Sequence, residues 1–333
     1  MIANVPDWRV TLDGRDISPR LRPRLVSLSI SEKRGDEADQ LDIVLDDTDG
    51  ALALPPDGAK LHVHIGWKQG SDVTPGLVDK GSFIVDEVSH GGPPDLVTIR
   101  ARSADFTSDL KTRREKSWQG TTLGAIVTEI AQRHKLIARC AASLSGIAVT
   151  TKAQSRESDL AFLRRLGREH DAVATIKRGA LILSPIGKGV TATGKLLPTV
   201  TIRRNQGDTH QFSRQKREEA EGVQADWHDR AAGKRKTVTA GKPTRAKKLS
   251  KVHASEADAK RAAASAHGRT QRQPVSMTLT LALGRADLHP EQGATVTGYK
   301  AAIDATRWLI GEVTHTLGDR GFTTGLKLET GHP

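Results

Sequence analysis

The chain has 333 residues, 36% of them apolar and 3% aromatic, and a formal net charge of +12. Its length predicts roughly two or three domains, and its single cysteine, Cys140, excludes an intramolecular disulfide. Residues 1–10 lack the apolar stretch of a signal peptide, and no run reaches the roughly 20 apolar residues of a membrane span. We therefore expect a protein that is made in the cytosol and has no stable membrane insertion.

Charge is divided unevenly along the chain. Residues 1–105 hold 12 Lys/Arg and 18 Asp/Glu, a net charge of −6, whereas residues 106–333 hold 39 and 21, a net charge of +18. A uniform nucleic-acid-binding coat would not show this division. The division predicts separate surfaces with different neighbours.

The first third of the chain has the pattern of β-structure. Apolar and polar residues alternate in four runs, 26–31, 41–45, 61–65 and 97–101. Such alternation gives a strand one buried and one solvated face. Turn-forming residues separate the runs at 47–50, 55–58 and 91–94. Short, regularly spaced strands favour an antiparallel barrel or sandwich.

The middle third predicts helices followed by strands. Leu123, Ile126, Val127 and Ile130 follow helical spacing, with Thr121 or Thr122 as the N-cap. A second helix is expected after Ser158 and ends near His170. Strands at 173–177 and 181–183 follow, joined by a turn at 178–179. This third is therefore expected to be α/β.

The last third returns to strands from about Val200, with a polar interruption. Residues 230–251 contain nine basic residues and no acidic one, and we interpret them as a basic loop. Ser255 and Asp258 predict the start of an Ala-rich helix that runs to about Arg269. Alternating residues at 275–283 and 322–328 predict closing strands. The fold class is α+β and mainly β.

Two loops resemble ligand-binding motifs without meeting their requirements. Residues 189–195 fit G-x-x-x-x-G-K, but Leu196 stands where a phosphate-binding loop needs Ser or Thr, and no helix follows. The acidic segment 46–50 would place Leu45 at the first calcium ligand position, where a carboxylate is required. We interpret these segments as a glycine-punctuated loop and an acidic turn.

His62 and His64 lie two residues apart, so both imidazoles share one face of the predicted strand. A metal site would need a third ligand, and none is apparent in the sequence. The motifs H-E-x-x-H and G-x-S-x-G do not occur. We favour a polar strand face, and the sequence predicts no catalytic, cofactor-binding or metal-binding residue.

The basic residues of 230–251 also support a nucleic-acid hypothesis, because clustered Lys and Arg neutralise phosphates. Single-strand binders interleave stacking aromatics, however, and none lies between Trp227 and Tyr299. We favour a solvated loop that contacts an acidic protein neighbour, and keep nucleic-acid binding as the alternative.

Four segments, in order, resemble the phage late control D family, the baseplate hub proteins of contractile-tailed phages and phage-like bacteriocins. The family is similar to the N-terminal part of the VgrG spike of type VI secretion. The third segment is the most specific and resembles the signature E-S-D-x-x-F-L-x-R-L. The segments are residues 39–47 with Pro55, Gly58 and Ala59; residues 81–88 with Pro93 and Pro94; residues 157–166 with Glu169, His170 and Gly179; and residues 255–262 with Gly284, Arg285, Leu288, Pro290, Gly293 and residues 321–324.

The resemblance implies a structural protein of the virion baseplate and not an enzyme. It implies a first tube-like β-barrel domain (1–107), an α/β domain (108–195) and a second tube-like β-barrel domain (196–333) with a basic loop and helix insertion at about 230–271. Such hubs form homotrimers whose six similar domains make a pseudo-sixfold ring between tail tube and spike. The expected partners also include tape measure and baseplate wedge proteins, and genome DNA passes through the lumen without sequence-specific binding. A hub fragment of a type VI-like spike is the close alternative.

Overall fold

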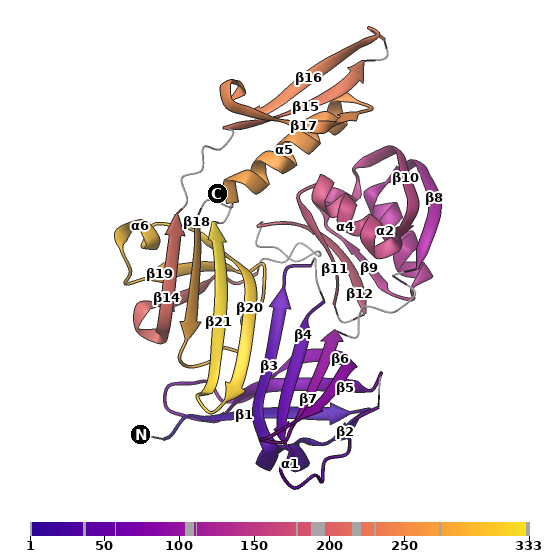
Figure 1. Ribbon diagram of the computed structural model, residues 1–333. Coiled ribbons are helices and arrows are strands. Elements are labelled where there is room, and N and C mark those ends of the chain that lie inside the picture. Colours follow the sequence, from indigo (N-terminus) through magenta and orange to yellow (C-terminus); the bar gives the residue numbers. More distant parts are fainter. Residues whose placement is uncertain are drawn as a thin grey trace.

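The computed structural model describes residues 2–35, 38–56, 58–103, 110, 112–177, 179–187, 197–214, 221–229, 231–272 and 275–330. Figure 1 shows two β regions side by side, an α/β unit next to them, and a smaller sheet with a long helix that projects from one end. None of the described helices is long and apolar enough to cross a membrane.

The first β region supplies one half of a large sheet. Its elements are β1 (Val5–Leu12), β2 (Arg15–Asp16), α1 (Ser18–Leu21), η1 (Arg22–Arg24), β3 (Leu25–Lys33), β4 (Gln40–Asp46), β5 (Lys60–Gln69), β6 (Gly76–Gly91) and β7 (Leu96–Ser103). The four runs of alternating residues lie in β3, β4, β5 and β7, as predicted. The long strand β6, between β5 and β7, was not predicted.

The second β region supplies the other half. Its elements are β13 (Val200–Arg203), η3 (Arg204–Gln206), β14 (Gly207–Arg214), β18 (Val275–Leu281), β19 (Gly293–Thr297), α6 (Ala301–Asp304), β20 (Trp308–Gly318) and β21 (Gly321–Thr330). The two predicted closing strands correspond to β18 and β21.

Both β regions belong to one continuous sheet. Among the described residues it has 13 strands, in the order β14-β18-β21-β20-β3-β4-β7-β6-β5-β1-β2, with β19 and β13 branching from β20. The join is an antiparallel pairing of β20 with β3, from Glu312 opposite Lys33 to Gly318 opposite Ser27. The sequence predicted a β region at each end of the chain but gave no sign that they share a sheet.

The α/β unit contains two small sheets and two longer helices. Its elements are β8 (Arg113–Thr122), α2 (Leu123–Arg133), β9 (Ile137–Cys140), α3 (Ala142–Ser145), β10 (Ala148–Ser158), α4 (Asp159–Glu169), β11 (Ala172–Lys177) and β12 (Ala180–Pro185). Both predicted helix starts are confirmed, because Thr122 Oγ1 accepts from Ala125 N–H and Ser158 Oγ accepts from Ala161 N–H, each at 3.2 Å.

The predicted basic loop at 230–251 is wrong, because the described residues of this segment form strands. The insertion consists of β15 (Gly222–Asp229), β16 (Lys234–Gly241), η4 (Pro243–Arg245), β17 (Ala246–His253) and α5 (Glu256–Arg272). Val223 and Ala225 of the sheet pack against Ala259 and Ala263 of α5. These side chains are small, so their burial leaves only a weak hydrophobic pattern in the sequence. The cap at Ser255 is confirmed, since its Oγ accepts from Asp258 N–H at 3.2 Å.

Candidate functional site

The junction between the two β regions is tightly packed as well as hydrogen-bonded. Trp67 of β5 donates its indole N–H to the carbonyl of Gly284 at 2.8 Å, and its ring lies 5.4 Å from that of Phe322 in β21. Position 284 must be glycine, because a Cβ there would lie 2.5 Å from the Phe322 ring. Leu317 and Phe322 belong to the hydrophobic core of the first β region. The core of the first β region therefore takes in side chains from β20 and β21 of the second, whose own core is a separate cluster.

Three charged or titratable side chains are buried at this junction. Glu32 of β3 accepts from Lys80 Nζ of β6 at 2.6 Å and lies 3.3 Å from Nε2 of His315 in β20. The other ring nitrogen of His315, Nδ1, lies 3.0 Å from Thr324 Oγ1. Buried charges must be paired to be tolerated, and here the partners come from both β regions.

The protonation states follow from this pairing. Burial alone would raise the pKa of Glu32, but the hydrogen bond with His315 and the charge of Lys80 lower it overall, so Glu32 is ionised. Burial dominates for His315 and lowers its pKa, so the folded protein favours the neutral imidazole.

Two further ion-pair groups tie the first β region to its neighbours. Arg34, which follows β3, pairs with Glu291 and, at 2.5 Å, with Glu329 of the second β region. Asp39 pairs at 2.9 Å with Lys177 of the α/β unit. Arg34 and Asp39, between β3 and β4, thus link the first β region to the second β region and to the α/β unit.

The most specific sequence motif, at residues 157–166, has a structural role. The carboxylate of Asp159 is fully buried and lies 2.8 Å from Arg133 Nη1, from His134 Nε2 and from Gln154 Nε2. Burial alone would raise the pKa of Asp159, but these hydrogen bonds lower it overall. The carboxylate thereby joins α4 to the end of α2 and to β10.

Other residues of the motif complete the same unit. Arg165 binds Glu157 at 2.8 Å, and the ring of Phe162 stacks on that of Trp118 at 5.9 Å. The α/β unit in turn carries the insertion, because Ser265 Oγ and Arg269 Nη1 of α5 donate to the carbonyl of Arg168 at 2.8 and 2.7 Å.

Of the two loops that resemble ligand-binding motifs, the structure describes only the acidic turn at 46–50. The glycine-punctuated loop at 189–195 lies outside the described residues. In the acidic turn, Arg24 binds both carboxylate oxygens of Asp49, at 2.6 and 2.5 Å, and lowers the pKa of Asp49 to about 2. Asp46 accepts from Thr48 N–H at 2.9 Å. These carboxylates hold the turn together.

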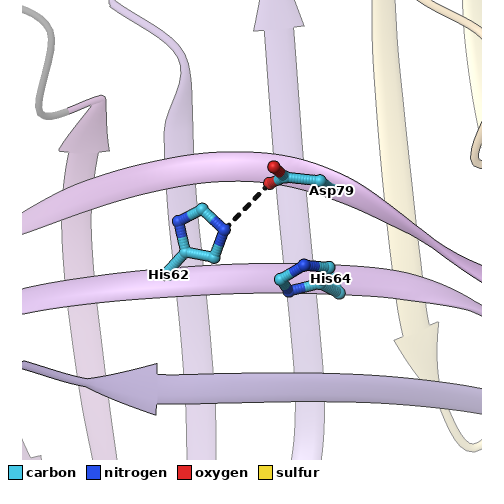
Figure 2. Close-up of side chains that lie close together, drawn as sticks. All are labelled: His62, His64 and Asp79. Atoms are coloured by element: carbon cyan, nitrogen blue, oxygen red, sulfur yellow. Dashed lines mark ion pairs between the residues drawn. The ribbon is translucent and has the colours of Figure 1, made fainter. Parts of the chain in front are cut away.

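The histidine pair has a third ligand-type neighbour that the sequence did not reveal. His62 and His64 lie on the same face of β5, and Asp79 of the adjacent strand β6 lies beside them, with His62 Nε2 3.0 Å from Asp79 Oδ1 (Figure 2). The register of β5 and β6 shifts at Val63 and His64, which sets His64 opposite Asp79. Burial and the charge of Arg9 lower the pKa of His64.

Known proteins share both the sequence and the fold. A family model described as phage tail baseplate hub (GPD) matches residues 41–321. The probable baseplate hub protein of Escherichia phage 186 is 43% identical, over 97% of this chain and 92% of the relative. A tail protein of Neisseria meningitidis MC58 superposes with a TM-score of 0.73 at 15% identity, covering 98% and 96% of the two chains. A type VI secretion component of E. coli has a TM-score of 0.54 at 14% identity, covering 97% of this chain and 77% of that one.

The fold, with its two β regions joined through one sheet, is therefore that of tail proteins and of a type VI component. The chain belongs to the family of phage tail baseplate hub proteins. Its role is structural, and its place is the tail of the virion.

We expect His315 to make the protein less stable in mild acid. Unfolded histidine takes up a proton below its ordinary pKa of 6.5, whereas buried His315 resists protonation, so the free energy of unfolding falls as the pH drops below that value. His315→Gln should reduce the decline between pH 7 and pH 5 by up to about 1.4 kcal/mol per pH unit, the slope for one proton. Urea unfolding at each pH measures the difference, and identical slopes would contradict the assignment.

We expect Asp159→Asn to lower the free energy of unfolding by about 1.5–3 kcal/mol, because the buried hydrogen bonds from Arg133, His134 and Gln154 would lose their charged acceptor. Urea denaturation measures this change. Glu115→Gln is the matched control, since Glu115 pairs with Arg156 at the exposed surface and should change stability by no more than about 0.5 kcal/mol. Equal effects of the two substitutions would contradict a structural role for the motif.

Proposed function

We propose that this hub assembles as a homotrimer that joins the tail tube to the central spike of a contractile tail. The observation that carries the proposal is the continuous sheet, which fixes two β regions with separate cores side by side in one chain. Two tube-like β units per chain would give a ring of six units from three chains. Such a ring matches a sixfold tube on one side and a threefold spike on the other.

In this proposal the tube-like domains span residues 1–107 and 196–333, and the α/β domain spans 108–195. The insertion at about 230–271 lies on the α/β domain through α5, where it is available to a further component such as a wedge protein. Tape measure protein and genome DNA would pass through the lumen. The mechanism is mechanical: the ring, assembled in the host cytoplasm, opens or sheds the spike when the sheath contracts.

The oligomeric state tests the proposal. Mass photometry and electron microscopy of the full chain, with and without the spike protein, should show threefold particles. A chain that stays monomeric even with the spike protein present would overturn it. If the chain were instead the hub fragment of a type VI-like spike, it would assemble only with a fused or separate needle of that system.

Nucleic-acid binding through the insertion is the second candidate, and its local charge pairing argues against it. Lys248 and Lys236 bind Asp226 and Asp229 of β15 at 2.9 and 2.7 Å. Lys242 binds Glu221 at 3.0 Å, and Lys251 binds Glu169 at 3.2 Å. Much of the positive charge is therefore compensated within the protein.

We expect filter binding of DNA across a salt series to give only weak retention above about 150 mM salt, as in non-specific binding. Reversing the charge of the exposed residues Lys234, Arg245 and Lys247 should change retention no more than reversing that of three exposed residues of the first β region, Arg15, Arg20 and Lys68. Tight binding with a steep salt dependence that only the insertion variant abolishes would establish the nucleic-acid function instead.

A further inference from the structure

We propose that His62, His64 and Asp79 form a binding site for a divalent transition metal ion of the zinc class on the outer face of the first β region. The site is independent of the proposed trimer. It uses side chains that alternate with the buried residues Leu61 and Val63 and therefore point away from the core.

His62 is held in an orientation suitable for a ligand. Its Nδ1 lies 2.9 Å from Ser82 Oγ, and its Nε2 points to Asp79 Oδ1 at 3.0 Å (Figure 2). Histidine ligands commonly use one ring nitrogen for the metal and fix the ring with a hydrogen bond from the other. Ser82 Oγ can accept that hydrogen bond from the Nδ1–H of His62. Asp79 is itself positioned by accepting from Gly81 N–H at 2.7 Å.

His64 has a ring nitrogen without a hydrogen-bond partner. Its Nε2 faces Arg9 of β1 at 3.4 Å, whereas its Nδ1 is buried and unpaired among the described residues. A buried polar atom without a partner costs free energy. Because Arg9 can only donate, Nε2 is the acceptor of this contact and Nδ1 carries the ring proton, so metal binding at Nδ1 would move that proton to Nε2 and turn the Arg9 side chain away. The guanidinium of Arg9 opposes a cation and limits the affinity, while the carboxylate of Asp79 compensates for it.

The spacing and the donor types favour zinc over magnesium or calcium. Each residue offers one ligand atom, and the three atoms lie within 4.8 Å of one another. Tetrahedral zinc with bonds of about 2.0–2.1 Å needs ligand atoms about 3.3 Å apart, a contraction that side-chain rotation can supply. Two imidazoles and one carboxylate suit zinc, whereas magnesium and calcium prefer oxygen ligands throughout. A fourth position remains for water or a group from a neighbouring molecule.

A metal here would link β5 to β6 where their register shifts. The two strands are neighbours in the sheet, and the irregularity between Val63 and His64 interrupts their regular pairing. Coordination by side chains from both strands would stabilise this irregular position. The simpler alternative is that His62 and Asp79 form only a surface ion pair.

Isothermal titration of the full, metal-free chain with zinc chloride tests the site. We expect one equivalent to bind, with at least a tenfold loss of affinity in Asp79→Asn and in His62→Ala. His90→Ala is the matched control. His90 lies on the same strand as Asp79, with its Nε2 3.6 Å from Asp47 Oδ2, and among the described residues it belongs to no group of three metal-ligating side chains. This variant should bind zinc like the wild type.

Two further measurements separate coordination from misfolding. Cobalt added in place of zinc should give the visible absorption of a four-coordinate site in the wild type and in His90→Ala only. Zinc should raise the Tm of these two proteins and leave that of Asp79→Asn unchanged, although all three have the same circular dichroism without metal. Absence of stoichiometric zinc binding to the wild type, or equal binding by Asp79→Asn, would overturn the proposal.

Discussion

The pairing of β20 with β3 is the constraint on which the rest of the structure depends. It brings residues 312–318 against residues 27–33, almost the whole length of the chain apart. Closing so long a loop costs entropy, which the two strands alone do not repay. The compensation comes from the apolar contacts that the pairing makes possible, with Leu317 and Phe322 entering the first core and Trp67 reaching Gly284. The pairing, the core and the junction therefore depend on one another in the folded protein.

The buried ions at the junction are better explained by geometry than by stability. Replacing a buried ion pair with apolar residues is often neutral or stabilising. The pair of Glu32 and Lys80 is therefore a poor explanation for a high free energy of unfolding. Their contacts are directional, however, because Glu32 meets Lys80 from β6 and the imidazole of His315 from β20, which also contacts Thr324.

Sequence reasoning predicted the local structure and missed what depends on distant strands. Alternation and capping residues located β3, β5 and the starts of α2 and α4, because these signals act within a few residues. The strands β16 and β17 were missed because they are rich in Lys and contain few apolar residues, of which Val238, Ala240 and Leu249 are only partly buried against the small core of the insertion. Asp79 was missed as a neighbour of His64 because the shifted register of β5 and β6 decides which residues meet. The family motif at Asp159 was found, but its meaning as a buried carboxylate bound to α2 required the structure.

The basic residues that lie together in the sequence at 230–251 do not form one compact patch of charge in the folded insertion. Along a strand, successive side chains point to opposite faces, so the basic residues of β16 and β17 are distributed over two faces. The central strand β15 adds Asp226 and Asp229 beside them, and Glu169 of α4 adds a carboxylate from the α/β unit. Within the insertion, part of the positive charge is thereby paired and the rest is divided between two faces of the sheet. This distribution is one reason why we propose a protein neighbour with scattered carboxylates for the insertion, in place of the dense, regular phosphates of a nucleic acid.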